Sequence, residues 1–173
     1  DSKKALDIAG IIGGEASGIK ANTTSIILTC ANFPASLIRR TSVKQNIRTE
    51  ASARYEKALD PTLAPQALAL AVQMIRQLMP TARVSSKVVD IDHSPDYHRT
   101  IIVPKEMISS MIGMSISDKQ VKDILQRLQF GVRLQAKAFE VTVPSWRATK
   151  DITIPQDLVE EVARIYGYDN VVP

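Results

Sequence analysis

The sequence is poor in the residues that build reactive or cross-linked sites. It has one cysteine, Cys30, which excludes an internal disulfide and any zinc site that needs several cysteines. The only histidines, His93 and His98, lie in a polar stretch typical of a turn, so a Cys/His nucleophilic pair has little support. We expect Cys30 to be a small buried side chain in a strand over 25–30.

Long apolar runs are also missing, which excludes a membrane-spanning helix. The first residues lack the apolar core of a signal peptide, and we therefore expect a cytoplasmic protein with no membrane contact. With 173 residues, of which 45% are hydrophobic, the chain can bury the core of one domain or of two small ones.

Glycine is scarce, and three of the seven glycines fall within residues 10–14. No Gly-Lys-Ser/Thr follows them and the Gly-x-Gly-x-x-Gly spacing is absent, so a phosphate-binding loop is disfavoured. We expect Gly13 and Gly14 to allow a left-handed turn and the close approach of a ligand or of another strand.

The net charge is +4, and part of the excess is concentrated between residues 39 and 57. The cations of this segment are Arg39, Arg40, Lys44, Arg48, Arg54 and Lys57. A segment of this kind can follow a phosphate backbone, where each neutralised phosphate adds affinity that does not depend on sequence. The alternative is an ordinary solvated loop and helix face.

Periodicity predicts an α+β fold with two units, 1–83 and 84–173, separated by a polar stretch. The expected strands cover 7–14, 25–30, 88–92, 100–103, 130–134 and 139–143, and the expected helices cover 49–57, 65–80, 104–111, 117–128 and 155–166. The helix over 65–80 has an apolar stripe that we expect to pack on the strands, with Met74 and Met79 in the core. The last two strands are expected to form a hairpin with its turn near Lys137.

The order helix, helix, hairpin in the second unit is similar to a winged-helix arrangement. Lys119, Lys122 and Arg127 then lie on or near the second helix, where DNA-binding members of that architecture carry their groove-reading residues. Asp118 and Asp123 interrupt this basic face, so we interpret it as solvated charge.

Four carboxylates gather around the start of the last helix: Asp151, Asp157, Glu160 and Glu161. Oxygen ligands at this density suit Mg²⁺ or Ca²⁺, provided that Asp151 folds back toward the helix. The competing interpretation is that acids in a first helical turn are stabilised by the helix dipole, and that Glu160 pairs with Arg164 one turn later.

Two stretches resemble one known family, in the order in which that family has them. The first comprises Ala9-Gly-Ile-Ile-Gly-Gly-Glu15 and Arg48-Thr-Glu-Ala-Ser-Ala-Arg-Tyr-Glu56. The second comprises Pro144-Ser-Trp-Arg147 and Asp157-Leu-Val-Glu-Glu-Val-Ala-Arg-Ile-Tyr-Gly-Tyr-Asp-Asn170. Together they are similar to the beta subunit of bacterial phenylalanyl-tRNA synthetase. The resemblance implies part of a mixed α/β editing domain, followed by a winged-helix-like module that has become architectural.

The same resemblance implies the roles of particular residues. The acidic cluster corresponds to a magnesium site near the alpha subunit, with all four acids as ligands in the assembled enzyme. The pocket that removes tyrosine wrongly attached to the phenylalanine tRNA corresponds to Gly13, Thr49 and Ala51, with Thr29 standing where the family commonly has a glutamate. RNA contact is implied for Arg39, Arg40, Lys44 and Arg48.

The implied assembly is a heterotetramer with the alpha subunit that acts on tRNA. ATP is used by the whole enzyme and is not bound by this chain, for which we expect no catalytic residue and no activity alone. The alternative function is a non-catalytic winged-helix module that binds nucleic acid. Residues 10–61 favour the synthetase, because a general winged helix has no need of them.

Overall fold

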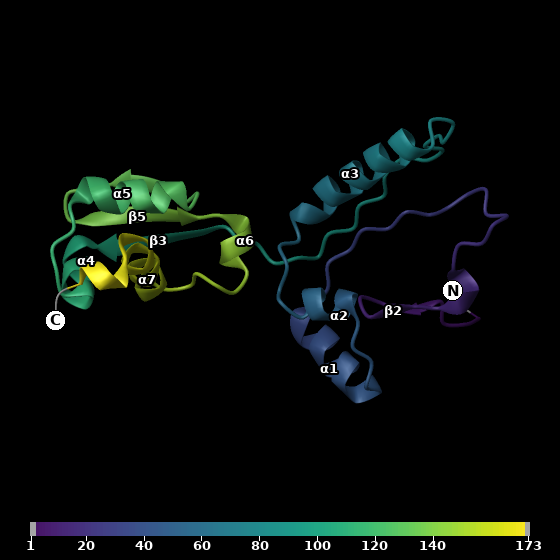
Figure 1. Cartoon of the computed structure of the whole chain (residues 1–173), viewed down its shortest axis with the longest axis horizontal. Helices are drawn as coiled ribbons and strands as arrows, with labels where there is room; N and C mark the ends of the chain where they lie inside the picture. Colours follow the sequence, from purple (N-terminus) through teal and green to yellow (C-terminus); the bar gives the residue numbers. More distant parts are fainter. Residues whose placement is uncertain (1–2, 172–173) are drawn as a thin grey trace. The chain divides into compact units, whose positions relative to one another are not determined.

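The computed structural model describes residues 3–171 and divides between Ser94 and Pro95 into two compact units. Each unit is described by itself, and Figure 1 shows the elements of both. Helices and small antiparallel sheets are both present, which confirms the predicted α+β class.

Unit 1 begins with a tight hairpin of two short strands, β1 (Asp7–Ile8) and β2 (Ile12–Gly13). The left-handed residue of this turn is Gly10, at φ +70°, and the expectation that Gly13 and Gly14 would take this conformation is wrong. A Cβ atom at Gly10 would lie 2.7 Å from the ring of Phe33 and 2.8 Å from Ile38, so the turn requires glycine on two counts.

Two helices pack beside the hairpin and close a small core. The helix α1 (Ala35–Gln45) buries Ile38 and Ser42, which are one turn apart. The next helix, α2 (Glu50–Tyr55), lies within the predicted range 49–57. Its last residue meets the ring of Phe33 edge to face at 5.0 Å between centroids. A short 3-10 turn, η1 (Glu15–Ser17), follows the hairpin.

The strands predicted over 25–30 and 88–92 are not formed, and this corrects the sequence analysis. A strand is stable only with a hydrogen-bonded neighbour, and the described part of the chain pairs neither segment. Ile27 is 93% exposed, and Cys30 is exposed rather than buried.

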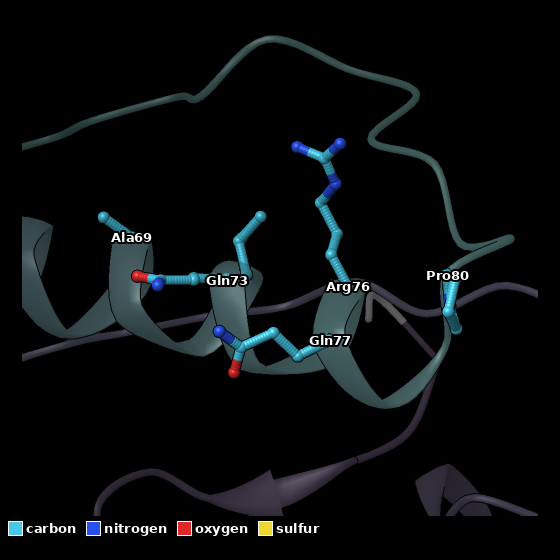
Figure 2. A pocket seen from close by; sticks show the side chains of 6 residues that line it. Ala69, Gln73, Arg76, Gln77 and Pro80 are labelled. Carbon is cyan, nitrogen blue, oxygen red and sulfur yellow. The ribbon is translucent and has the colours of Figure 1, made fainter.

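The long helix of unit 1, α3 (Leu63–Leu78), is as long as predicted but buries none of its residues. Its apolar stripe was expected to pack on strands, and Met74 and Met79 are instead each 52% exposed. The strands that would have covered it did not form. Figure 2 shows the shallow hollow along this helix, lined by Val72, Arg76 and Pro80 among others, and it contains no predicted site residue.

Unit 2 is built around a three-stranded antiparallel sheet in the order β3-β5-β4. Its elements, in chain order, are β3 (Arg99–Pro104), α4 (Lys105–Ile112), α5 (Asp118–Arg127), β4 (Gly131–Leu134), β5 (Ala138–Val143), α6 (Ser145–Ala148), α7 (Pro155–Tyr166) and η2 (Tyr168–Asn170). The helices α4, α5 and α7 gather around the sheet (Figure 1).

Buried and more exposed side chains alternate along β3 and β5, so that the buried ones lie on the face of the sheet that packs against the helices. Ile101 and Val103 of β3, and Phe139, Val141 and Val143 of β5, are buried, whereas the residues between them are not. Phe139 of β5 is paired with Val103 of β3 on one side and with Leu134 of β4 on the other. The strands β4 and β5 are the two strands of the predicted hairpin. The predicted hairpin is therefore confirmed.

The boundaries of the helices in unit 2 follow the predicted signals. Ser117 caps α5 by accepting from the backbone N–H of Gln120, and Gly167, at φ +100°, ends α7. Leu158 and Val162 face the core as predicted. The finer winged-helix assignment stays a prediction.

No helix within residues 3–171 combines the length and the apolar character needed to cross a membrane.

Candidate functional site

Thr49 joins the start of α2 to the turn of the hairpin. Its hydroxyl donates to the carbonyl oxygen of Ile11 at 2.5 Å and accepts from the backbone N–H of Ser52 at 3.1 Å. The Ser52 hydroxyl in turn accepts from the backbone N–H of Thr49 at 2.9 Å. The reciprocal capping box closes the start of α2, and the bond to Ile11 ties this end of the helix to the turn between β1 and β2. The single proton of the Thr49 hydroxyl is thus engaged, so toward a ligand this side chain can only accept.

The other predicted pocket residues take different positions around this contact. Gly13 lies at the exposed end of β2, and a Cβ added there meets no atom within 4 Å. Gly14 differs, because its Cβ would lie 2.3 Å from the carbonyl oxygen of Leu6. Ala51 is half-buried on α2, while Thr29 lies in the exposed segment 25–30, outside the contact between α2 and the hairpin. Position 14 therefore requires glycine for folding, whereas the surface around Gly13 is open.

The four predicted RNA-contacting cations are all exposed. Arg39, Arg40 and Lys44 belong to α1, and Arg48 belongs to the loop that leads to α2. Arg48 donates to Glu56 at 3.0 Å. Partial burial acts to raise the pKa of Glu56, but the hydrogen bond and charge of Arg48, with the charges of Lys57 and Arg39, hold that pKa below its usual value. Arg48 is therefore partly neutralised within the chain.

In unit 2, Asp157 turns back onto the backbone at the start of its own helix. Its Oδ2 accepts from the backbone N–H groups of Thr153 at 2.7 Å and Ile154 at 3.0 Å, and from the Thr153 hydroxyl at 3.2 Å. Burial alone would raise the pKa of Asp157, but these donors lower it below its usual value. The carboxylate therefore acts as a cap for α7.

Glu161 is buried, with 7% of its surface exposed, and is held by two arginines. Arg147 Nη1 donates to its Oε2 at 3.1 Å and Arg164 Nη2 donates to the same oxygen at 2.7 Å. Arg147 also donates through Nε to Asp151. The pair expected between Glu160 and Arg164 is thus replaced by a pair between Glu161 and Arg164, three residues apart.

The ionisation of this network follows from its geometry. Burial acts to raise the pKa of Glu161, but the hydrogen bonds and charges of Arg147 and Arg164 lower it below its usual value. The hydrogen bond to Glu161 is the main cause that raises the pKa of Arg147. Both groups are therefore ionised across the physiological range.

The four predicted metal ligands do not converge in this arrangement. Asp151 and Glu161 face Arg147, Asp157 faces the backbone, and Glu160 is exposed. Among residues 3–171, no three carboxylate, imidazole or thiol side chains are grouped so that they could hold a metal ion. As it stands the site fits arginine and backbone donors, and the magnesium site stays a prediction for the assembled enzyme.

Comparison with known proteins accounts for both units. Residues 1–80 match the B3/4 domain, and residues 101–168 match the tRNA synthetase B5 domain. Over its full length the chain is 42% identical to the phenylalanine–tRNA ligase beta subunit of Solibacter usitatus, of which it covers 23%. It is 40% identical over 99% of its length to that of Clostridium acetobutylicum, and 39% identical over 99% to that of Pectobacterium atrosepticum, covering 21% of each.

The chain belongs to the phenylalanine–tRNA ligase beta-subunit family. It spans about a fifth of the length of these relatives. The family assignment made from the two sequence stretches is therefore confirmed.

Sequence reasoning missed the residue that organises the acidic cluster. The sequence gives Arg147 only as part of the Pro-Ser-Trp-Arg motif, although its spacing of four residues from Asp151 is a signal for an ion pair. Its contact with Glu161 spans 14 residues and two elements, and no local pattern indicates it. The roles predicted for Gly13, Thr29, Thr49 and Ala51 in a pocket stay predictions.

Proposed function

We propose that this chain is a segment of the beta subunit of a phenylalanine–tRNA ligase, which acts in the cytoplasm with an alpha subunit to attach phenylalanine to its tRNA at the expense of ATP. The observation that carries the proposal is the similarity to beta subunits along the whole chain, through two domain families in sequence. ATP is used by the whole enzyme, and we assign no nucleotide site to this chain.

Unit 1 contributes one wall of a hydrolytic pocket that clears tyrosine from the phenylalanine tRNA. The support is the hydrogen bond from Thr49 to Ile11, which ties α2, the helix that carries the half-buried Ala51, to the hairpin whose second strand ends at the open surface of Gly13. Thr49 can accept a hydrogen bond from a phenolic hydroxyl with its remaining lone pair, and discrimination of tyrosine from phenylalanine needs such a polar partner. Thr29, which stands where the family commonly has a glutamate, is a shorter and uncharged acceptor, and it lies in the exposed segment outside the contact between α2 and the hairpin.

The exposed cations of α1, with Arg48, contact the backbone of the tRNA. Their exposure supports this role, since a side chain that reaches a phosphate has to be free of the core. Unit 2 serves as an architectural module against the alpha subunit, and its dense core and central sheet suit a rigid support.

The experiment places a side chain at Gly13 in the complete enzyme assembled with its alpha subunit. Gly13→Leu has room for its Cβ and should fold, but its side chain covers the surface where the tyrosyl group is proposed to lie. We expect hydrolysis of tyrosyl-tRNA to fall at least about tenfold, equivalent to roughly 1.4 kcal/mol of transition-state stabilisation, with phenylalanine charging preserved.

The matched control is Gly14→Ala, whose Cβ would meet the carbonyl oxygen of Leu6 at 2.3 Å. This neighbouring substitution should lower the melting temperature together with hydrolysis, whereas Gly13→Leu should leave the melting temperature nearly unchanged. Hydrolysis at the wild-type rate in a folded Gly13→Leu enzyme would remove Gly13 from the pocket.

A further inference from the structure

The part of the acidic cluster around the buried Glu161 already has its charge balanced. Asp151 and Glu161 contribute two negative charges, and Arg147 and Arg164 contribute two positive charges within the same contacts. Repulsion between carboxylates is what a divalent cation would relieve. Here the two guanidinium groups relieve it, so the electrostatic drive for metal binding is largely removed.

The oxygen of Glu161 that points into the cluster has no remaining capacity for a metal. Its Oε2 accepts from Arg147 at 3.1 Å and from Arg164 at 2.7 Å, and a carboxylate oxygen offers two lone pairs in its plane. Its Oε1 receives a longer contact from Arg164 Nε at 3.4 Å. A metal ion would have to displace a guanidinium group in order to bind Oε2.

Arg147 is held in this position by its surroundings. Its backbone carbonyl accepts from the N–H of Ile152 at 2.9 Å, and Ala148 and Ile152 are 1% and 2% exposed. The carbonyl of Ile152 is itself bound by Arg99 at 3.0 Å. The guanidinium group lies 5.7 Å from the centroid of the Phe130 ring, at a distance that favours a cation. The arginine is therefore anchored on both sides and faces the acids as a fixed element.

We propose that Arg147 is the cation that the acidic cluster of this chain binds, and that it occupies the place of a divalent metal ion. Asp151 and Glu161 can bind a metal only after the guanidinium group of Arg147 has withdrawn. Arg147 is thus a positioning residue that keeps the cluster closed in the chain by itself, and any metal in the assembled enzyme competes with it.

The test compares thermal unfolding of the full 173-residue chain with and without Mg²⁺ at constant ionic strength. Wild type is expected to show no Mg²⁺-dependent change in its melting temperature. Arg147→Met keeps a long apolar stem over Phe130 but leaves Asp151 without its guanidinium partner. We expect this variant to melt lower without Mg²⁺ and to gain about 3 °C or more at about 10 mM Mg²⁺.

Arg133→Met is the matched control, because Arg133 is a 78% exposed arginine of the same unit that pairs with Glu140 at 3.8 Å. It should show no Mg²⁺ response. Adding Glu161→Gln to Arg147→Met should abolish the gain, since the amide is a poorer metal ligand. The proposal is overturned if wild type is stabilised by Mg²⁺ as much as Arg147→Met, or if Arg147→Met responds no more than Arg133→Met.

A second measurement covers the case in which Arg147→Met does not fold. In wild type, the side-chain Nε–H resonance of Arg147 can be followed by ¹⁵N NMR during the same Mg²⁺ titration. We expect its chemical shift to stay constant, because the ion pairs persist. A shift that saturates with Mg²⁺ in the isolated chain means that the metal displaces Arg147 readily, and contradicts the proposal.

Discussion

Asp157 illustrates how one carboxylate can satisfy a helix end. The N–H of the N-cap residue of a helix has no partner within the helix. Here one oxygen of Asp157 accepts from the N–H of the N-cap residue Ile154 and from that of Thr153 before it. The negative charge also lies at the positive end of the dipole of α7. Both effects favour an acid at this position without any metal.

Asp157→Ala is therefore expected to destabilise unit 2 by about 1 kcal/mol, the usual cost of losing a side-chain cap. The measurement is chemical denaturation of the chain. Glu160→Ala serves as the control, since Glu160 is exposed, and should change stability by less than about 0.5 kcal/mol. Equal losses for the two variants would contradict the capping role.

The same contacts give Asp157 a defined pH dependence. Because its pKa is lower in the folded chain than in the unfolded chain, its contribution is complete above the unfolded pKa, near 3.9, and is lost as the pH falls through the folded pKa. Asp157→Asn cannot ionise, so the stability of this variant should fall less steeply with acid below about pH 4.

In the helix α1, the residues that pack in the core are distinct from the charged residues that meet solvent. Ile38 and Ser42 form its buried side, and its arginines and its lysine are exposed. We expect Arg39→Gln, Arg40→Gln and Lys44→Gln together to leave folding intact and to weaken tRNA binding.

The salt dependence of binding distinguishes phosphate contacts from a general loss of charge. Three lost contacts should reduce the slope of log K against log salt concentration by about 2, measured by filter binding or fluorescence anisotropy with the assembled enzyme. Arg76→Gln on α3 is the control, because Arg76 is also exposed but lies outside the predicted contact. A slope unchanged by the triple substitution would remove α1 from the RNA surface.

The elements of unit 2 were predicted, including β3, whose partner β5 is distant in the sequence. In unit 1 the helix α1 was not predicted, and the single strand expected over 7–14 is the hairpin of β1 and β2. The hairpin of β4 and β5 and the helix α7 carry their own alternation, caps and stripes. The segments 25–30 and 88–92 have equally strand-like sequences, but a strand also needs a neighbour, which the described residues do not provide. The apolar stripe of α3 is exposed for the same reason, because the strands expected to pack on it did not form.

The candidate sites divide in a similar way. Residue types and spacing indicated which acids gather near α7, but not which donors they face, because those contacts depend on the path of the chain through α6. Thr49 was predicted as a pocket residue from a resemblance alone. Its bond to Ile11 crosses 38 residues and could not be read from the sequence.

For the whole molecule, the chain alone is expected to show no synthetase activity. It spans about a fifth of the length of its relatives, and we propose that the site for amino-acid activation belongs to the alpha subunit. Phenylalanine-dependent pyrophosphate exchange by the purified chain should equal the background of a reaction without protein. Exchange above that background, abolished by heating the chain, would contradict this expectation.

Because β5 is the central strand of the sheet in unit 2, its hydrogen bonds should be the last of that unit to break. Its residues pair with β3 on one side and with β4 on the other, and Val141 in its middle has no exposed surface. Amide protons of this strand can exchange with deuterium only when the sheet and the helices over it separate together. We therefore expect the slowest exchange in unit 2 at residues 139–143, with a rate that reports the complete unfolding of the unit. Amides of the exposed segment 25–30 should exchange within the dead time.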